Sequence, residues 1–145
     1  MSDASKNGNE RMTGHVSTER VSIEIEGLAH QTAIPVASKT GPLVASSVIA
    51  PFNPHTRDVP DSIEAQYQNI FRHAGLMLAA AGGGWEHVTK MEFWLAQAAD
   101  RAALEPIWIN QFPEEARRPA RHTHVGGVKR MSASFLAYVP DRIPT

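Results

Sequence analysis

Residues 61–95 read DSIEAQYQNIFRHAGLMLAAAGGGWEHVTKMEFWL, and this stretch decides the fold. Asp61 and Glu64 have the spacing of a capping box. Apolar residues then recur at helical spacing until Gly82-Gly83-Gly84 ends the pattern. The triplet lacks the Lys-Ser/Thr ending of a phosphate-binding loop, so we interpret it as a helix stop. The repeating apolar positions are Ile63, Tyr67, Ile70, Phe71, Ala74 and Leu78.

Strands are predicted on both sides of this helix. Val88–Leu95 has the period-two pattern of a strand with one apolar face. Towards the N-terminus, Val21–Glu26 alternates in the same way and Leu43–Ile49 is a short apolar run. Residues 51–60 hold three prolines, which favours an ordered loop. Residues 1–20 carry almost no apolar side chains, so we predict a disordered tail there and a folded domain over residues 21–145.

The C-terminal part predicts a second helix and two more strands. The helix is expected to start near Asp100 and to turn Leu104 and Trp108 inward. Pro106 would cost about 3 kcal/mol in a helix interior, so we expect a kink or a late start. Met131–Val139 alternates as a half-buried strand does.

The order of these elements predicts an α+β domain with both helices on one face of a sheet. The other sheet face then needs cover, and self-association is the simplest way to bury it. We therefore expect a homo-oligomer.

Composition narrows the classes of function. A chain of 145 residues fits one domain. The net charge of -1, with scattered basic residues, gives no general attraction to nucleic acid. There is no cysteine, so thiolate chemistry, cysteine metal sites and disulfides are excluded. No stretch predicts a membrane span or a signal peptide, and we expect a cytoplasmic protein without a nucleic-acid or membrane partner.

Pro119-Ala120-Arg121 is the most informative motif for function. Proline suits the first residue of a strand, which places Arg121 near the beginning of a strand. A guanidinium stays charged and offers a rigid fork of donors that matches a carboxylate through two hydrogen bonds. Arg121 is therefore a candidate for binding a planar anion.

Several separated motifs together resemble the Rid family of YjgF-like imine and enamine deaminases, also described as the L-PSP endoribonuclease family. The resemblance covers roughly residues 34–139. The motifs, in chain order, are Ile49–Pro60, Ala65-Gln66, Ala80-Ala81-Gly82, Val88-Thr89-Lys90, Phe112 and Pro119-Ala120-Arg121.

The resemblance implies a chorismate-mutase-like single domain with a mixed β-sheet, two helices packed on one face, and assembly as a homotrimer with clefts between subunits. It implies hydrolytic deamination of a small enamine or imine carboxylate, such as 2-aminoacrylate or an aminomuconate, without a cofactor. By resemblance, Arg121 holds the substrate carboxylate, Ser46 lies beside the cleft, and Thr123 lines the same cavity.

The chain also departs from the family pattern. A glutamate that active deaminases carry on the last strand aligns with Ser134, and a hydroxyl is a poor base at neutral pH. An early aromatic residue aligns with Ile34, and a helix asparagine aligns with Glu105, whose carboxylate can substitute as a proton carrier. A non-catalytic carboxylate-binding protein is therefore the alternative, and a ribonuclease is the weakest option because no aromatic array suits single-stranded nucleic acid.

The histidines are a further candidate site. His122 and His124 would project to one strand face, as two metal ligands do, and to the face opposite Arg121. No acidic residue is close to them in the sequence pattern, so we interpret them as packing or interface residues and predict no metal site. His73 and His87 are expected to be surface or interface residues.

Overall fold

The computed structural model describes residues 19–140 of the chain. Residues 1–18 of the predicted tail lie outside the described residues. The first strand begins at Arg20, the last residue of the predicted tail.

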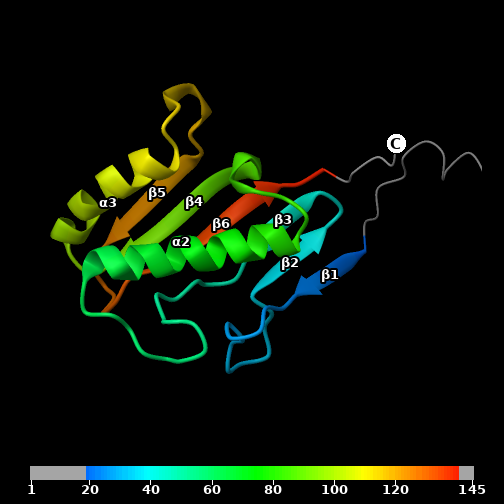
Figure 1. Cartoon of the computed structure of the whole chain (residues 1–145), viewed down its shortest axis with the longest axis horizontal. Coiled ribbons are helices and arrows are strands. Elements are labelled where there is room, and N and C mark those ends of the chain that lie inside the picture. Colours follow the sequence, from blue (N-terminus) through cyan, green and yellow to red (C-terminus); the bar gives the residue numbers. More distant parts are fainter. Residues whose placement is uncertain (1–18, 141–145) are drawn as a thin grey trace, which may run out of the picture.

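Among the described residues, six strands form one sheet in the order β1-β2-β3-β6-β4-β5 (Figure 1). Strands β4 and β5 are parallel and all other neighbours are antiparallel, so the sheet is mixed. Two helices, α2 and α3, cover one face of it, which confirms the predicted architecture. The strands are β1 (Arg20–Ile23), β2 (Ala37–Thr40), β3 (Leu43–Ser46), β4 (Val88–Leu95), β5 (Ala120–Val125) and β6 (Ser132–Tyr138), and the helices are α2 (Ile63–Ala80) and α3 (Ala98–Gln111).

Helix α2 is capped by Ser62, not by Asp61 as the sequence pattern suggested. The Ser62 hydroxyl accepts a hydrogen bond from the backbone N–H of Ala65 at 3.1 Å, which satisfies one of the free donors at the helix start. The helix ends at the glycines as predicted, because Gly82 adopts a φ of 86°, a conformation that favours glycine.

Helix α3 begins earlier than predicted and contains Pro106 in its interior, so the expected late start is wrong. The Asp100 carboxylate explains the early start, because it accepts a hydrogen bond from the backbone N–H of Gln97 at 3.3 Å. Trp108 faces the core as predicted and is 6% exposed.

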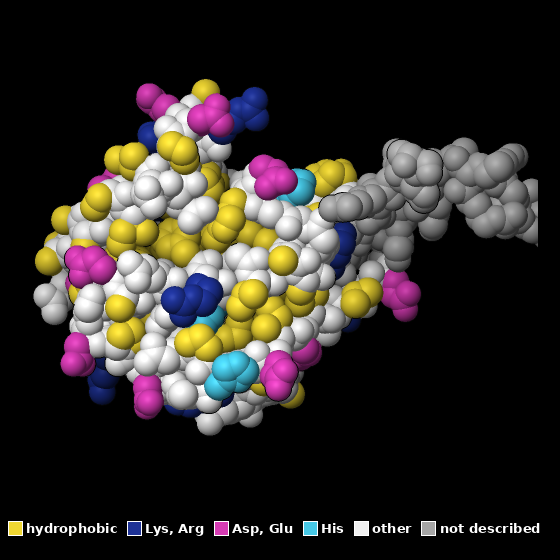
Figure 2. Space-filling model, viewed as in Figure 1, with side chains coloured by type: hydrophobic (Ala, Val, Ile, Leu, Met, Phe, Trp, Pro, Cys, Tyr) yellow, Lys and Arg dark blue, Asp and Glu magenta, His cyan; other side chains and the backbone are white. Residues whose placement is uncertain are grey.

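The core lies between the helices and the sheet. Phe93 in β4 is fully buried, and its ring centroid lies 6.2 Å from that of Tyr67 and 6.3 Å from that of Trp108. Burying one such aromatic side chain contributes about 1.5–3 kcal/mol. Figure 2 shows the helix side of the molecule, where hydrophobic side chains gather in the furrow between α2 and α3.

The sheet face opposite the helices, here called the open face, carries exposed apolar side chains. Leu43 and Tyr138 pair across β3 and β6 and are 49% and 58% exposed, and Leu136 beside them is 38% exposed. The expected self-association over this face stays a prediction. No helix in the described part of the chain is both long enough and apolar enough to cross a membrane.

Candidate functional site

Arg121 lies near the beginning of the edge strand β5, as predicted, and points to the helix side of the sheet. It pairs with the buried Met91 of β4, which places both side chains on the face that α3 covers. The guanidinium carbon lies 5.0 Å from the ring centroid of Trp108, within the range of a cation–π contact. The Arg121 side chain is 18% exposed. The sheet and α3 therefore fix the position of this cation.

One arm of the Arg121 fork already has a partner. Nη2 donates a short hydrogen bond to the Oε2 atom of Glu105, a half-exposed residue of α3. Nη1 is buried and has no hydrogen-bond partner among the described residues. A buried donor without a partner costs free energy, so Nη1 keeps unused hydrogen-bonding capacity. The free part of the fork is smaller than the two-bond grip that the sequence suggested.

Tyr67 lies near this cation but does not offer a proton at neutral pH. Its hydroxyl donates to the backbone carbonyl of Asp100 at 2.5 Å. Burial raises the pKa of Tyr67 strongly, the Asp100 charge raises it further, and the Arg121 charge opposes them. Tyr67 therefore stays a neutral, structural hydrogen-bond donor.

Thr123 lies two residues after Arg121 on the same strand face and is partly buried. Ser46 lies on β3, in the cross-strand row that runs through Phe135 and Met91 to Arg121. Its hydroxyl accepts a hydrogen bond from the backbone N–H of Phe135 at 2.9 Å. Three strand spacings separate β3 from β5, which amounts to about 14 Å. Ser46 therefore does not reach Arg121 within one chain.

The remaining two residues also lie apart from Arg121. Ser134 of β6 pairs with Glu92 on the open face, so its side chain points to the other side of the sheet. Ile34 lies in the loop before β2, towards the opposite end of the sheet, and is 42% exposed. A single chain unites Arg121, Glu105 and Thr123 and separates them from the other predicted positions.

The sequence pattern indicated that Trp108 only packs in the core, and its contact with Arg121 was not predicted. Trp108 packs in the core and also supports the guanidinium of Arg121. The available signal was its spacing from Glu105, because residues three apart on a helix share a face.

The prediction that no acidic residue lies near His122 and His124 is wrong. Glu92 of β4 lies beside both histidines, because the parallel pairing of β4 and β5 puts it opposite His122. The two histidines do lie on the face opposite Arg121, as predicted.

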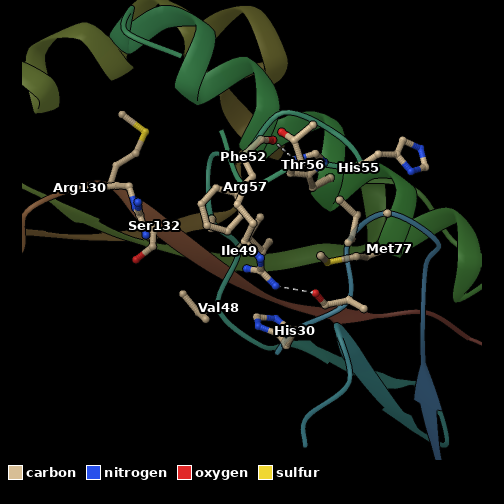
Figure 3. Close-up of a pocket in the computed structure, with 16 residues that line it drawn as sticks. His30, Val48, Ile49, Phe52, His55, Thr56, Arg57, Met77, Arg130 and Ser132 are labelled. Atoms are coloured by element: carbon tan, nitrogen blue, oxygen red, sulfur yellow. Dashed lines mark hydrogen bonds between the residues drawn. The ribbon is translucent and has the colours of Figure 1, made fainter. Parts of the chain in front are cut away.

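A pocket of about 640 Å³ lies away from Arg121, between the 27–30 loop, the 48–57 loop, α2 and the start of β6 (Figure 3). The guanidinium carbons of Arg57 and Arg130 each lie 5.1 Å from the ring centroid of Phe52. Arg57 also donates a hydrogen bond to the backbone carbonyl of Ala29. None of the predicted site residues lines this pocket.

His73 lines the same pocket and is buried within the chain, which corrects the expectation of a surface or interface position. It is 2% exposed, and its Nε2 atom lies 2.7 Å from the carbonyl oxygen of Phe52. Burial lowers the pKa of His73, the hydrogen bond to Phe52 opposes that shift, and the Arg72 charge adds to it. His73 is therefore neutral at pH 7.

The chain is similar to proteins of known families. A family model described as Endoribonuclease L-PSP matches residues 34–136. The chain is 37% identical over 60 residues to a RutC family protein of Synechocystis, which covers 41% of this chain and 45% of that protein. It is 33% identical over 89 residues to the chloroplastic Reactive Intermediate Deaminase A of Arabidopsis thaliana, which covers 61% of this chain and 46% of that protein. The matches thus span less than half the length of these relatives.

Solved structures share the fold at low sequence identity. The Rid family protein YyfA from Yersinia pestis superposes with a TM-score of 0.77 at 19% identity, covering 83% of this chain and 100% of that one. The YjgF gene product of E. coli superposes with a TM-score of 0.74 at 20% identity, covering 81% of this chain and 98% of that one.

Proposed function

The chain belongs to the Endoribonuclease L-PSP family, and from this premise we propose that it removes the amino group of a small reactive imine or enamine acid by hydrolysis. The observation that carries the proposal is the buried Nη1 of Arg121, which has no partner among the described residues. Its similarity to a protein named Reactive Intermediate Deaminase A supports the same class of reaction.

The substrate class follows from the surroundings of Arg121. A carboxylate bound at Nη1 would form a charge-assisted hydrogen bond, which is about twice as strong as a neutral one. Glu105 would remain on Nη2, so a carboxylate base would lie next to the bound acid. The site therefore suits a small molecule that presents one carboxylate and a reactive carbon beside it.

The proposed reaction balances without a cofactor. An enamine such as 2-aminoacrylate first tautomerises to the imine. The oxygen of a water molecule then bonds to the imine carbon while Glu105 takes a proton from that water, and the electron pair of the C=N bond moves to nitrogen, which is protonated. The amino nitrogen then receives a second proton through Glu105 while the new hydroxyl group gives up its proton, a C=O bond forms and the C–N bond breaks, leaving ammonia and a 2-oxo acid. Positioning by Arg121 supplies most of the rate enhancement.

We further propose that the cleft forms between subunits of a homotrimer. Arg121 lies at the β5 edge, whereas Ser46 and Ile34 lie towards the β1–β3 end of the sheet. A head-to-tail ring would bring the β5 edge of one chain to the β1–β3 end of the next. Such a ring would reunite positions that one chain separates.

A non-catalytic carboxylate-binding protein is the second candidate. Ser134 replaces the carboxylate of the last strand and faces the open side of the sheet, away from Arg121. Catalysis then depends on Glu105 alone, whereas carboxylate binding does not.

The test generates 2-aminoacrylate from serine with a PLP-dependent dehydratase and follows ammonia release with the full chain present. We expect acceleration that falls about 100-fold in Arg121→Ala, because charge-assisted hydrogen bonds contribute about 1.5–3 kcal/mol each. Arg121→Lys should lose about tenfold, because a point charge does not reproduce the fork. The matched control is Arg117→Ala, whose side chain is 80% exposed.

Glu105→Gln separates the two candidates. An enzyme that uses this carboxylate as its base should lose turnover and still bind pyruvate. Absence of acceleration by the wild-type chain, together with pyruvate binding that Arg121→Ala abolishes, would establish the binding protein. Full activity in Arg121→Ala would contradict both candidates.

A further inference from the structure

Three potential metal ligands meet on the open face, on the side of β5 opposite Arg121. Glu92 comes from β4, and His122 and His124 come from β5. The parallel register places Glu92 opposite His122, and His124 follows two residues later on the same face. Neighbouring strands of one sheet hold all three side chains, so their backbone positions are fixed.

The distances suit a small cation. Oε2 of Glu92 lies 2.6 Å from Nε2 of His124 and 3.8 Å from Nδ1 of His122. One ligand atom from each of the three residues lies within 4.8 Å of the others. Ligands at about 2.0–2.2 Å from a tetrahedral ion lie about 3.3 Å apart, so small side-chain rotations bring these atoms into place.

The surroundings hold two of the ligands in a binding form. The ring of Trp94 stacks on His124 with centroids 5.2 Å apart and planes 7° apart, which fixes the imidazole plane. The hydrogen bond between Nε2 of His124 and Oε2 of Glu92 holds these two side chains against each other. The Lys90 charge works against a bound cation and limits its affinity.

We propose that Glu92, His122 and His124 bind one divalent transition-metal ion per chain. Two imidazole nitrogens and one carboxylate oxygen match the preferences of Zn²⁺, Co²⁺ and Ni²⁺. The ion replaces the proton shared between His124 and Glu92. His122 is 58% exposed, so solvent reaches the site and water completes the coordination. This site is separate from the Arg121 site, because the sheet lies between them.

The test uses the full chain, free of any histidine tag and treated with a chelator, and titrates ZnCl₂ by calorimetry. We expect one Zn²⁺ per chain. His124→Ala and Glu92→Gln should weaken binding by roughly tenfold or more. His122→Ala gives a second variant with little risk to folding, because the side chain is largely exposed. A Co²⁺ titration should show visible absorption bands that the same variants lose.

The matched control is His55→Asn, because His55 is exposed and has a φ of 64°, which asparagine tolerates. Zn²⁺ should raise the melting temperature of the wild-type chain and of His55→Asn, and not that of His124→Ala. Absence of Zn²⁺ binding by the wild-type chain would overturn the proposal. Equal binding by the wild-type chain and the His122→Ala, His124→Ala double variant would overturn it as well.

Discussion

The two faces of strand β5 differ in charge and in cover. On the helix side, Arg121 is a largely buried cation held between Glu105 and Trp108. On the open face, His122 and His124 surround a carboxylate and remain accessible to solvent. The strand thus presents an anion-binding group on one side and cation ligands on the other. Period-two alternation alone keeps the two chemistries apart.

The largest expected effect is a difference in the free energy of unfolding between substitutions on the helix side and on the open face of the sheet. Phe93→Ala should lower the free energy of unfolding by about 3–5 kcal/mol, because it leaves a cavity in the core under α2 and α3. Ser134→Ala, on the open face, should change it by less than about 0.5 kcal/mol. Urea unfolding followed by circular dichroism measures both. Equal losses would show that the core does not lie on the helix side alone.

Assembly is the next comparison. We expect light scattering to give three times the chain mass of 15.9 kDa. Leu136→Asp should lower the mass to that of one chain, because it puts a charge on the row of Leu43, Leu136 and Tyr138, which the proposed ring covers. Ile109→Asp is the control, since Ile109 is also exposed, at 48%, but lies on α3. A trimer that survives Leu136→Asp would remove this row of apolar side chains from the interface.

A substitution scan along β5 tests the alternation directly. Thr123→Val should slow deamination about tenfold, because it removes one hydroxyl from the face of Arg121. His122→Ala and His124→Ala should change deamination by less than about twofold while they weaken the proposed Zn²⁺ binding by roughly tenfold or more. Initial rates of ammonia release give the comparison. Loss of deamination at all three positions would mean that the two faces form one site.

The smallest expected effect is a pH dependence of stability from His73. Burial holds its pKa in the folded chain below the ordinary value of 6.5, so the unfolded chain takes up the proton first. Stability should be complete above pH 6.5 and should fall as the pH drops towards the lower pKa of the folded chain. His73→Gln should flatten this dependence in urea midpoints measured from pH 8 to pH 5. An unchanged slope in that variant would assign the dependence to other groups.

The elements with strong apolar periodicity could be predicted from the sequence. Helix α2, β4 and β6 each carry a regular pattern, and Pro119 marked the start of β5. Strand β2 could not be predicted, because Ala37–Thr40 has no alternation and is held by pairing on both sides.

The candidate site could be predicted only in part, because the sequence of one strand does not indicate which other strand it pairs with. Arg121 and Glu105 were found as separate residues, and α3 brings them into contact. The contact between Glu92 and His124 was not predicted, because 32 positions separate them in the chain. The predicted cleft residues of β3 and β6 do not meet Arg121 in one chain, so only the proposed assembly could bring them together.

The most direct test is a crystal structure of the full chain with pyruvate, the 2-oxo acid that 2-aminoacrylate would yield. We expect the pyruvate carboxylate within hydrogen-bond distance of Nη1 of Arg121, in a cleft that a neighbouring chain completes. A guanidinium that turns to open solvent, with pyruvate bound elsewhere or not at all, would contradict the account.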